Sequence, residues 1–83
     1  MTRDEEIRQG RNSERVLNDP LFKAAFDHIE SNLINALKRM PIGDRDGQHE
    51  VVLMLQLMNR LQGFFTEMIE TGKMATLQKE GRR

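Results

Sequence analysis

The sequence predicts an all-α protein: an antiparallel helical hairpin with long helices at about residues 20–40 and 46–72, preceded by a short polar N-terminal helix. In both long segments apolar residues recur at spacings of three and four, the repeat of a helix that packs along one side. Between the segments lies a short stretch with one proline and two glycines, which favours a reversal of the chain. The two helices should therefore lie side by side.

Length and charge exclude several classes of protein. The chain has 83 residues, with thirteen Lys plus Arg, thirteen Asp plus Glu and no Cys. This length provides one small domain, and a formal charge of zero argues against nucleic acid or an anionic membrane as the main partner. Without cysteine there is neither a disulfide nor a thiolate zinc site. The longest run free of charged residues, 51–59, is too short to cross a bilayer, so we expect an intracellular protein and no membrane partner.

The first long helix should begin at Asp19-Pro20, because an Asp side chain caps free amide groups and proline fits the first helical turn. It should end at Pro41, since proline disfavours helical geometry in the residue before it. Within these limits the apolar positions form one stripe: Phe22, Phe26, Ile29, Leu33, Ala36 and Met40.

The second long helix should begin after Asp44 or Asp46, either of which can cap it. Its stripe consists of Val51, Met54, Met58, Leu61, Phe65 and Met68, and a helix end is expected near Gly72. Folding the chain about the turn pairs positions whose numbers sum to 87, and five of the six pairs are apolar on both sides. This match is the best internal support for an antiparallel hairpin.

The two ends of the chain should be peripheral to the hairpin. Residues 1–18 form a polar segment, partly helical, with Ile7, Val16 and Leu17 as its main apolar residues. Residues 74–83 form a basic tail with few apolar residues, for which we expect flexibility. The predicted organisation is therefore a polar N-terminal segment at 1–18, the hairpin at 19–73 and a flexible tail at 74–83.

The second helix is apolar well beyond its stripe, and a helix of that kind is normally buried on several sides. The first helix and three N-terminal apolar residues cannot cover this surface, so self-association or a protein partner is expected. The expected partner or oligomer interface consists of Leu53, Leu57 and Phe64, with help from Leu21 and Ile34.

Catalytic and metal-binding patterns are missing from the sequence. His28 and His49 have no ligand spacing, and Ser13 and Ser31 lie in no nucleophile motif. The acidic run from Asp44 lacks the glycine and the final acid of a calcium loop. We therefore predict no catalytic residue, no metal, no cofactor and no enzymatic activity.

Arg8, Arg11 and Arg15 would share one face if the N-terminal segment is helical. Such a row can grip phosphates or carboxylates in two-pronged fashion. Asp4, Glu5, Glu14 and Asp19 lie within reach to neutralise it, so a solvated, salt-bridged face is the simpler interpretation. The row is nevertheless the best candidate for contact with a small anionic ligand.

A family resemblance is carried by residues 17–30, which read LNDPLFKAAFDHIE, by Gly63, and by residues 69–75, which read IETGKMA. These features resemble small uncharacterised helical-hairpin proteins of tailed bacteriophages and prophages, over about residues 15–77. Members of that group are often encoded near head and portal genes, so the resemblance implies a role in the particle or its assembly, in the virion or the host cytoplasm. At residues 36–40 this chain departs from its relatives, which tend to have a tryptophan followed by a Thr-Pro turn.

The expected function is therefore that of a non-enzymatic phage structural or accessory protein. It would associate with itself, or dock on another phage or host protein, through the apolar outer face of its second helix. The alternative is an oligomeric anti-defence protein that sequesters a nucleotide signal through the three arginines, or that inhibits a host enzyme.

Overall fold

The computed structural model describes residues 2–81, and these residues form three α-helices and no strand. The helices are α1 (Arg3–Asn18), α2 (Pro20–Arg39) and α3 (Arg45–Glu80). The predicted all-α class is confirmed.

The start of each helix is fixed by a side chain that accepts backbone hydrogen bonds. The Thr2 hydroxyl accepts from the Glu5 amide at 3.2 Å, and the Asp44 carboxylate accepts from the Gly47 amide at 3.0 Å. Asp19 accepts from the amides of Leu21 and Phe22 at 2.9 and 3.0 Å. These bonds satisfy amide groups that have no partner within the helix. They confirm the predicted cap at Asp19 and select Asp44 over Asp46 as the cap of α3.

A sharp bend joins α1 to α2 through the single residue Asp19. Its backbone is extended, with φ −67° and ψ 124°, because the ring of Pro20 excludes helical geometry from the preceding residue. The side chain of Asp19 then starts α2, so one dipeptide ends a helix and begins the next. The two helices consequently differ in direction.

The connection between α2 and α3 is short and held by one side chain. α2 ends at Arg39, one residue before the predicted boundary, and α3 begins at Arg45. The side-chain Nε2 group of Gln48 donates to the backbone carbonyl oxygens of Pro41 and Ile42 at 3.0 and 3.1 Å. The first turn of α3 thereby fixes the loop that leads into it.

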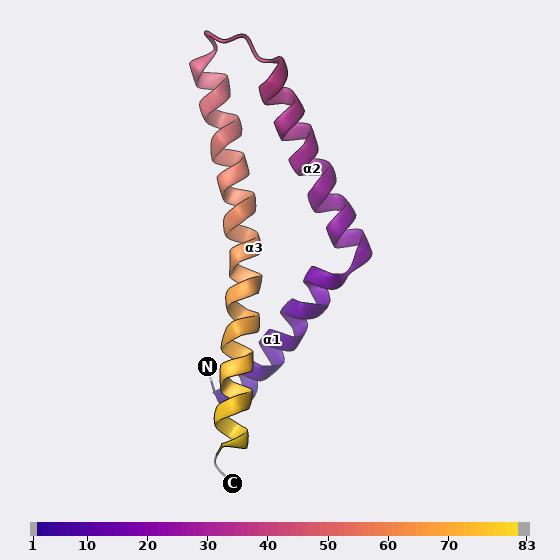
Figure 1. Ribbon diagram of the computed structural model, residues 1–83, viewed down its shortest axis with the longest axis vertical. Helices are drawn as coiled ribbons and strands as arrows, with labels where there is room; N and C mark the ends of the chain where they lie inside the picture. The colour runs from indigo at the N-terminus through magenta and orange to yellow at the C-terminus, as the bar shows by residue number, and fades with distance from the viewer. Residues whose placement is uncertain (1, 82–83) are drawn as a thin grey trace.

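The three helices make a hairpin in which one arm is bent. α1 and α2 follow one another along α3 and run antiparallel to it, with the bend bowed away from α3 (Figure 1). With 16 and 20 residues, the two helices together equal the 36 residues of α3. The molecule measures 62 × 24 × 15 Å and has a radius of gyration of 17.8 Å, against about 12 Å for a compact domain of this length.

The closest packing lies between α1 and the C-terminal half of α3. A Cβ atom added to Gly10 would lie 3.0 Å from the Gly72 Cα atom, so the two backbones meet at these glycines. The residues buried there are all small, namely Gly10, Ser13, Gly72 and Ala75. Small residues allow two helix backbones to approach closely. An exposed ion pair, Lys79 Nζ to Asp4 Oδ1 at 3.0 Å, joins the same two helices near their ends.

α2 packs more loosely on α3, chiefly through phenylalanines. The rings of Phe22 and Phe65 meet edge to face at 5.8 Å between centroids, and Phe26 adjoins Phe22 at 6.1 Å. Phe22 and Phe65 are one of the pairs whose numbers sum to 87, so the predicted register is confirmed at that pair. Val51, near the turn, is the only buried large apolar residue within residues 2–81.

Two predicted boundaries differ from the structure. α3 does not end near Gly72 but continues to Glu80, because Gly72 lies beneath α1 as a contact residue rather than as a helix terminator. Residues 74–80, assigned to a flexible tail, are therefore helical, and Ala75 is buried; the tail's residues 82 and 83 lie outside the described part of the chain. The N-terminal segment is likewise a complete helix packed on α3.

Candidate functional site

The five residues expected to form an interface are all exposed in the single chain. Their exposed fractions run from 38% to 79%. The N-terminal helix does not cover them, because α1 lies against the part of α3 around Met68 and Gly72. The apolar surface of α3 that precedes this region therefore faces solvent. The five exposed residues are Leu21 and Ile34 of α2 and Leu53, Leu57 and Phe64 of α3.

Residues of the hairpin seam are also uncovered. Ile29, Met54 and Leu61 belong to the stripes through which α2 and α3 were expected to pack, yet they are 47–50% exposed. In a four-helix bundle such positions point toward the bundle axis and are covered partly by each neighbouring helix. Three of the twelve seam positions are therefore open to solvent, while the other nine are buried or half-buried.

The exposed residues of α3 follow a heptad pattern. Met54, Leu57, Leu61 and Phe64 are separated by three, four and three residues, which places them on one side of the helix. We call this row the α3 stripe; Leu53 lies at its edge. An exposed row with this spacing has the geometry of a helix–helix contact.

The two residues from α2 do not extend this stripe together. Leu21 and Ile34 are thirteen positions apart, which puts them about 140° apart around the helix. They therefore flank α2 on different sides of its packed face. We expected both residues to contribute to one docking face. In the structure they lie at opposite edges of the packed face of α2, so they cannot belong to the same face.

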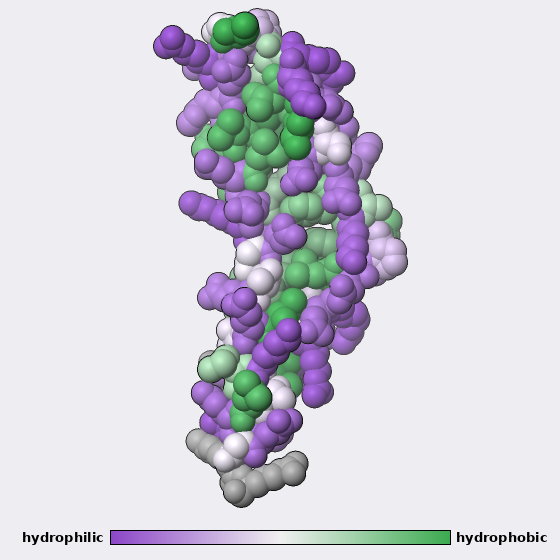
Figure 2. Space-filling model, in the orientation of Figure 1, coloured by the Kyte–Doolittle hydropathy of each residue, from purple (hydrophilic) through white to green (hydrophobic). Residues whose placement is uncertain are grey.

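Apolar side chains are prominent on the face of the molecule drawn in Figure 2. Figure 2 shows apolar side chains gathered along the middle of the molecule over α2 and α3, while hydrophilic side chains line its edges. No large side chain of residues 2–81 is fully buried. The isolated hairpin thus has a core that is open to solvent.

The three predicted arginines do lie together. Arg8, Arg11 and Arg15 line one open cavity of about 640 Å³ between α1 and the last turns of α3. Lys79, which was assigned to the flexible tail, adds a fourth cation. The other residues that line the cavity are Asp4, Ile7, Asn12, Thr76 and Glu80.

The acids expected to neutralise these arginines do not pair with them. Within residues 2–81 the only salt bridge is that of Lys79 with Asp4. Arg15 donates to the Asn12 side-chain oxygen at 2.9 Å, a contact with a neutral group. Within the described residues the row is therefore solvated, as the simpler interpretation expected, but not salt-bridged, and the guanidinium groups remain available.

A second, more apolar cavity of about 470 Å³ adjoins the first. Ile7, Arg11 and Thr76 line both, so the two cavities are neighbours at the contact of α1 with α3, and we call the pair the groove beside α1. The additional residues that line it include Gly10, Glu14, Ile69, Gly72, Lys73 and Leu77.

Sequence reasoning missed the residues that build this groove. Gly10 and Ser13 in α1, and Gly72 and Ala75 in α3, are two pairs of small residues with the same spacing of three. This repeated spacing was the available signal that α1 and α3 pack closely. It would also have placed residues 74–80 in a helix.

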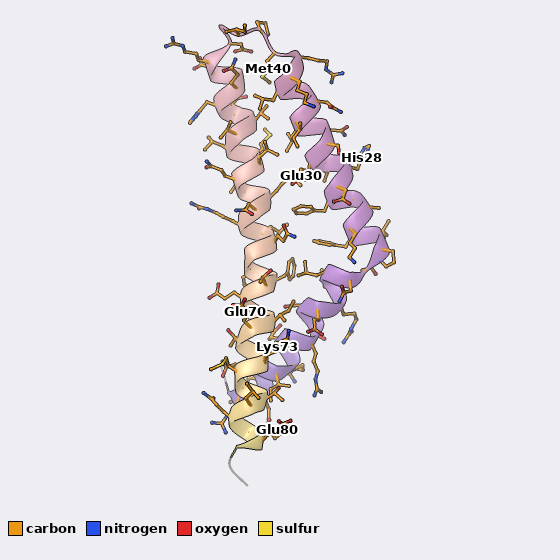
Figure 3. All side chains as sticks on the ribbon, in the orientation of Figure 1. His28, Glu30, Met40, Glu70, Lys73 and Glu80 are labelled. Carbon is orange, nitrogen blue, oxygen red and sulfur yellow. The ribbon has the colours of Figure 1, made fainter. Side chains whose placement is uncertain are left out.

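The histidines lie apart from both surfaces. His28 is exposed on the side of α2 away from α3 (Figure 3), where its Nε2 atom is 3.2 Å from the Asn32 Nδ2 atom. His49 is exposed in the first part of α3. Among residues 2–81, no three His, Asp or Glu side chains gather to hold a metal ion.

No helix in the part of the chain that the structure describes is both long and apolar enough to cross a membrane. Comparisons of the chain with family models, with curated proteins and with solved structures found no match. The exposed α3 stripe and the arginine cavity are the two candidate sites in residues 2–81.

Proposed function

We propose that this protein is a non-enzymatic helical assembly protein that associates with a second copy of itself through the α3 stripe. The observation that carries the proposal is the half-exposed seam at Ile29, Met54 and Leu61. A second hairpin laid against that side would turn an open two-helix layer into a four-helix core. Apolar side chains now in water would then be covered.

A second copy fits this surface because the stripe can face itself. In a two-fold symmetric pair the same patch lies on both sides of the interface. An antiparallel partner that sets Leu61 against the partner's Phe64 also brings Arg60 within two positions of the partner's Glu67 on the same flank. Arg60 and Glu67 each precede a stripe or seam residue by one position and are seven residues apart, so both lie on the same flank.

The biological setting follows from the resemblance of residues 17–30 and 69–75 to small phage proteins. It supports a structural or accessory role in a phage particle or its assembly, with the protein in the virion or the host cytoplasm. Mass spectrometry of purified particles should detect the chain at stoichiometric level; its consistent absence from particles and from assembly intermediates would contradict this setting.

The oligomeric state is the decisive test of the assembly proposal. Sedimentation velocity over a wide concentration range should show a dimer or a multiple of it. Leu57→Gln should weaken association by roughly 100-fold or more, because each dimer loses two leucines worth about 1.5–3 kcal/mol apiece when fully buried.

Leu77→Gln is the matched control, because Leu57 and Leu77 are both leucines of α3 with an exposed fraction of 63%. Leu77 lies in the groove beside α1, away from the stripe, so its substitution should leave association unchanged. A wild-type chain that remains monomeric at every concentration would exclude the self-assembly and leave docking on a different protein, such as a host enzyme, as the use of this face.

A further inference from the structure

We propose that the cavity between α1 and the end of α3 binds a small polyanion that carries two or more phosphate groups. The ligand would be held by Arg8, Arg11 and Arg15 of α1 and by Lys79 of α3. This site lies on the groove beside α1, so it does not depend on the assembly proposed above.

The charges around the cavity favour an anion. Four cationic side chains line it against two carboxylates, Asp4 and Glu80. Only one of the four cations, Lys79, is in an ion pair within residues 2–81. Guanidinium groups present paired N–H donors that match two phosphate oxygens, and three of them line this cavity without a carboxylate partner within residues 2–81.

The spacing of the arginines favours an extended ligand. Arg8, Arg11 and Arg15 follow at intervals of three and four residues, so they form one row that spans about 10 Å along the helix axis. A single phosphate reaches both ends of such a row only when the side chains of Arg8 and Arg15 bend toward each other. A chain of phosphates, or a molecule with phosphates at two positions, can contact the whole row without that rearrangement.

Lys79 and Asp4 form the competing contact. Their ion pair at 3.0 Å is exposed at both side chains, so it is weak. An arriving phosphate would take over the ammonium group, and the Asp4 carboxylate would repel the ligand. Removing the charge of Asp4 should therefore strengthen binding rather than weaken it.

The phosphates could belong to an inorganic chain or to a nucleotide. The adjoining cavity, lined by Ile7, Ile69 and Leu77, offers apolar surface next to Arg11 for a flat ring. A ligand that uses both cavities would bind more tightly than its phosphate chain alone. The comparison of the two kinds of ligand therefore identifies the source of the phosphates.

Isothermal titration of the full chain with tripolyphosphate at low ionic strength tests the site. Binding should be saturable and should weaken as salt is added. Arg11→Gln should weaken it about 10-fold or more, the scale of one charged hydrogen bond, while Asp4→Asn should tighten it. Arg39→Gln removes the same charge from an exposed helical position at the far end of α2 and should change nothing.

Parallel titrations separate the ligand sources. A nucleoside triphosphate or a cyclic dinucleotide that binds more tightly than tripolyphosphate assigns the adjoining cavity to the base; equal affinity assigns recognition to the phosphates alone. Failure of all three to bind would overturn the proposal. So would an Arg11→Gln chain, folded by circular dichroism, that binds as tightly as the Arg39→Gln control.

Discussion

Two glycines of this chain differ in the space that a side chain would have. At Gly10 an added Cβ would lie 3.0 Å from the Gly72 Cα atom and 3.0 Å from the Met68 carbonyl oxygen, whereas at Gly63 it would meet nothing within 4 Å. Both glycines lie inside helices. A glycine-to-alanine substitution would therefore place its methyl group against a packed backbone at Gly10 and in open space at Gly63.

Gly10→Ala should destabilise the protein by about 1–2 kcal/mol. The methyl group forces α1 away from α3, at a cost of about 1–3 kcal/mol for overpacking, and the better helix propensity of alanine recovers up to about 1 kcal/mol. Gly63→Ala is the matched control and should stabilise by about 0.5–1 kcal/mol. Urea denaturation at fixed protein concentration measures both; equal effects of the two substitutions would contradict the close contact at Gly10.

At the scale of the helices, Asp19 has the largest local effect because it separates α1 from α2 and also caps α2. Asp19→Ala should cost about 1 kcal/mol, since the amides of Leu21 and Phe22 lose their acceptor. Asp27→Ala replaces an exposed Asp inside α2 and should be neutral or slightly stabilising, because alanine is the better helix former. Thermal unfolding followed by circular dichroism compares the two.

The last two turns of α3 are needed to hold α1. A chain that stops at Lys73 loses buried Ala75, half-buried Thr76 and the Lys79 ion pair. We expect a loss of at least about 2 kcal/mol in unfolding free energy and a fall in helix content beyond that of the residues removed, because α1 loses its packing surface. Both are measured by circular dichroism with urea.

The control for this truncation is a chain that stops at Glu80, which retains every described contact between α1 and α3. It should unfold like the complete chain. If the chain ending at Lys73 were equally stable, residues 74–80 would be a dispensable extension, as the sequence alone suggested.

At the scale of the whole molecule, the open seam and the elongated shape have one cause. α1 packs closely through small residues, while α2 is held off by larger side chains and by the bend at Asp19. α3 is therefore in close backbone contact with another helix only along its C-terminal half. The remaining apolar surface is the part that a second copy would cover.

The antiparallel pairing predicts a charge dependence of the association. Arg60→Glu and Glu67→Arg should each weaken the dimer roughly 10-fold, because each places like charges near one another at two symmetric positions. The double substitution should restore most of the affinity. Sedimentation equilibrium measures all four chains. Additive weakening in the double variant would contradict this register while leaving the stripe itself in place.

Much of the fold was predictable from local signals. Asp19-Pro20 and Asp44 fix helix starts through chemistry that involves only neighbouring residues, and the alignment of the two apolar stripes predicted the contact of Phe22 with Phe65. The end of α3 was not predictable in this way. Gly72 reads as a helix terminator when considered locally, and only the contact with Gly10 shows why the helix continues.

Of the two candidate sites, the exposed apolar residues were predictable from the sequence and the unpaired arginines were not. Exposure of Leu53, Leu57 and Phe64 was expected from an excess of apolar residues that the chain could not cover, and it was found. The availability of Arg8, Arg11 and Arg15 was not expected, because nearby acids in the sequence suggested ion pairs. Which charged groups meet depends on side-chain positions in space, and Lys79 could not be added to the row while its segment was assigned to a tail.

By itself, the sequence determined the all-α class, the start of α2 at Asp19-Pro20 and the antiparallel contact of Phe22 with Phe65, because these depend on residues close in sequence and on the repeat of apolar positions. Only the tertiary structure decided that α1 packs on the end of α3, that α2 leaves the seam half open and that four cations line one cavity. Those features depend on how closely two backbones can approach. Small residues at Gly10 and Gly72 permit that approach at one end of the molecule, and the bend at Asp19 prevents it in the middle.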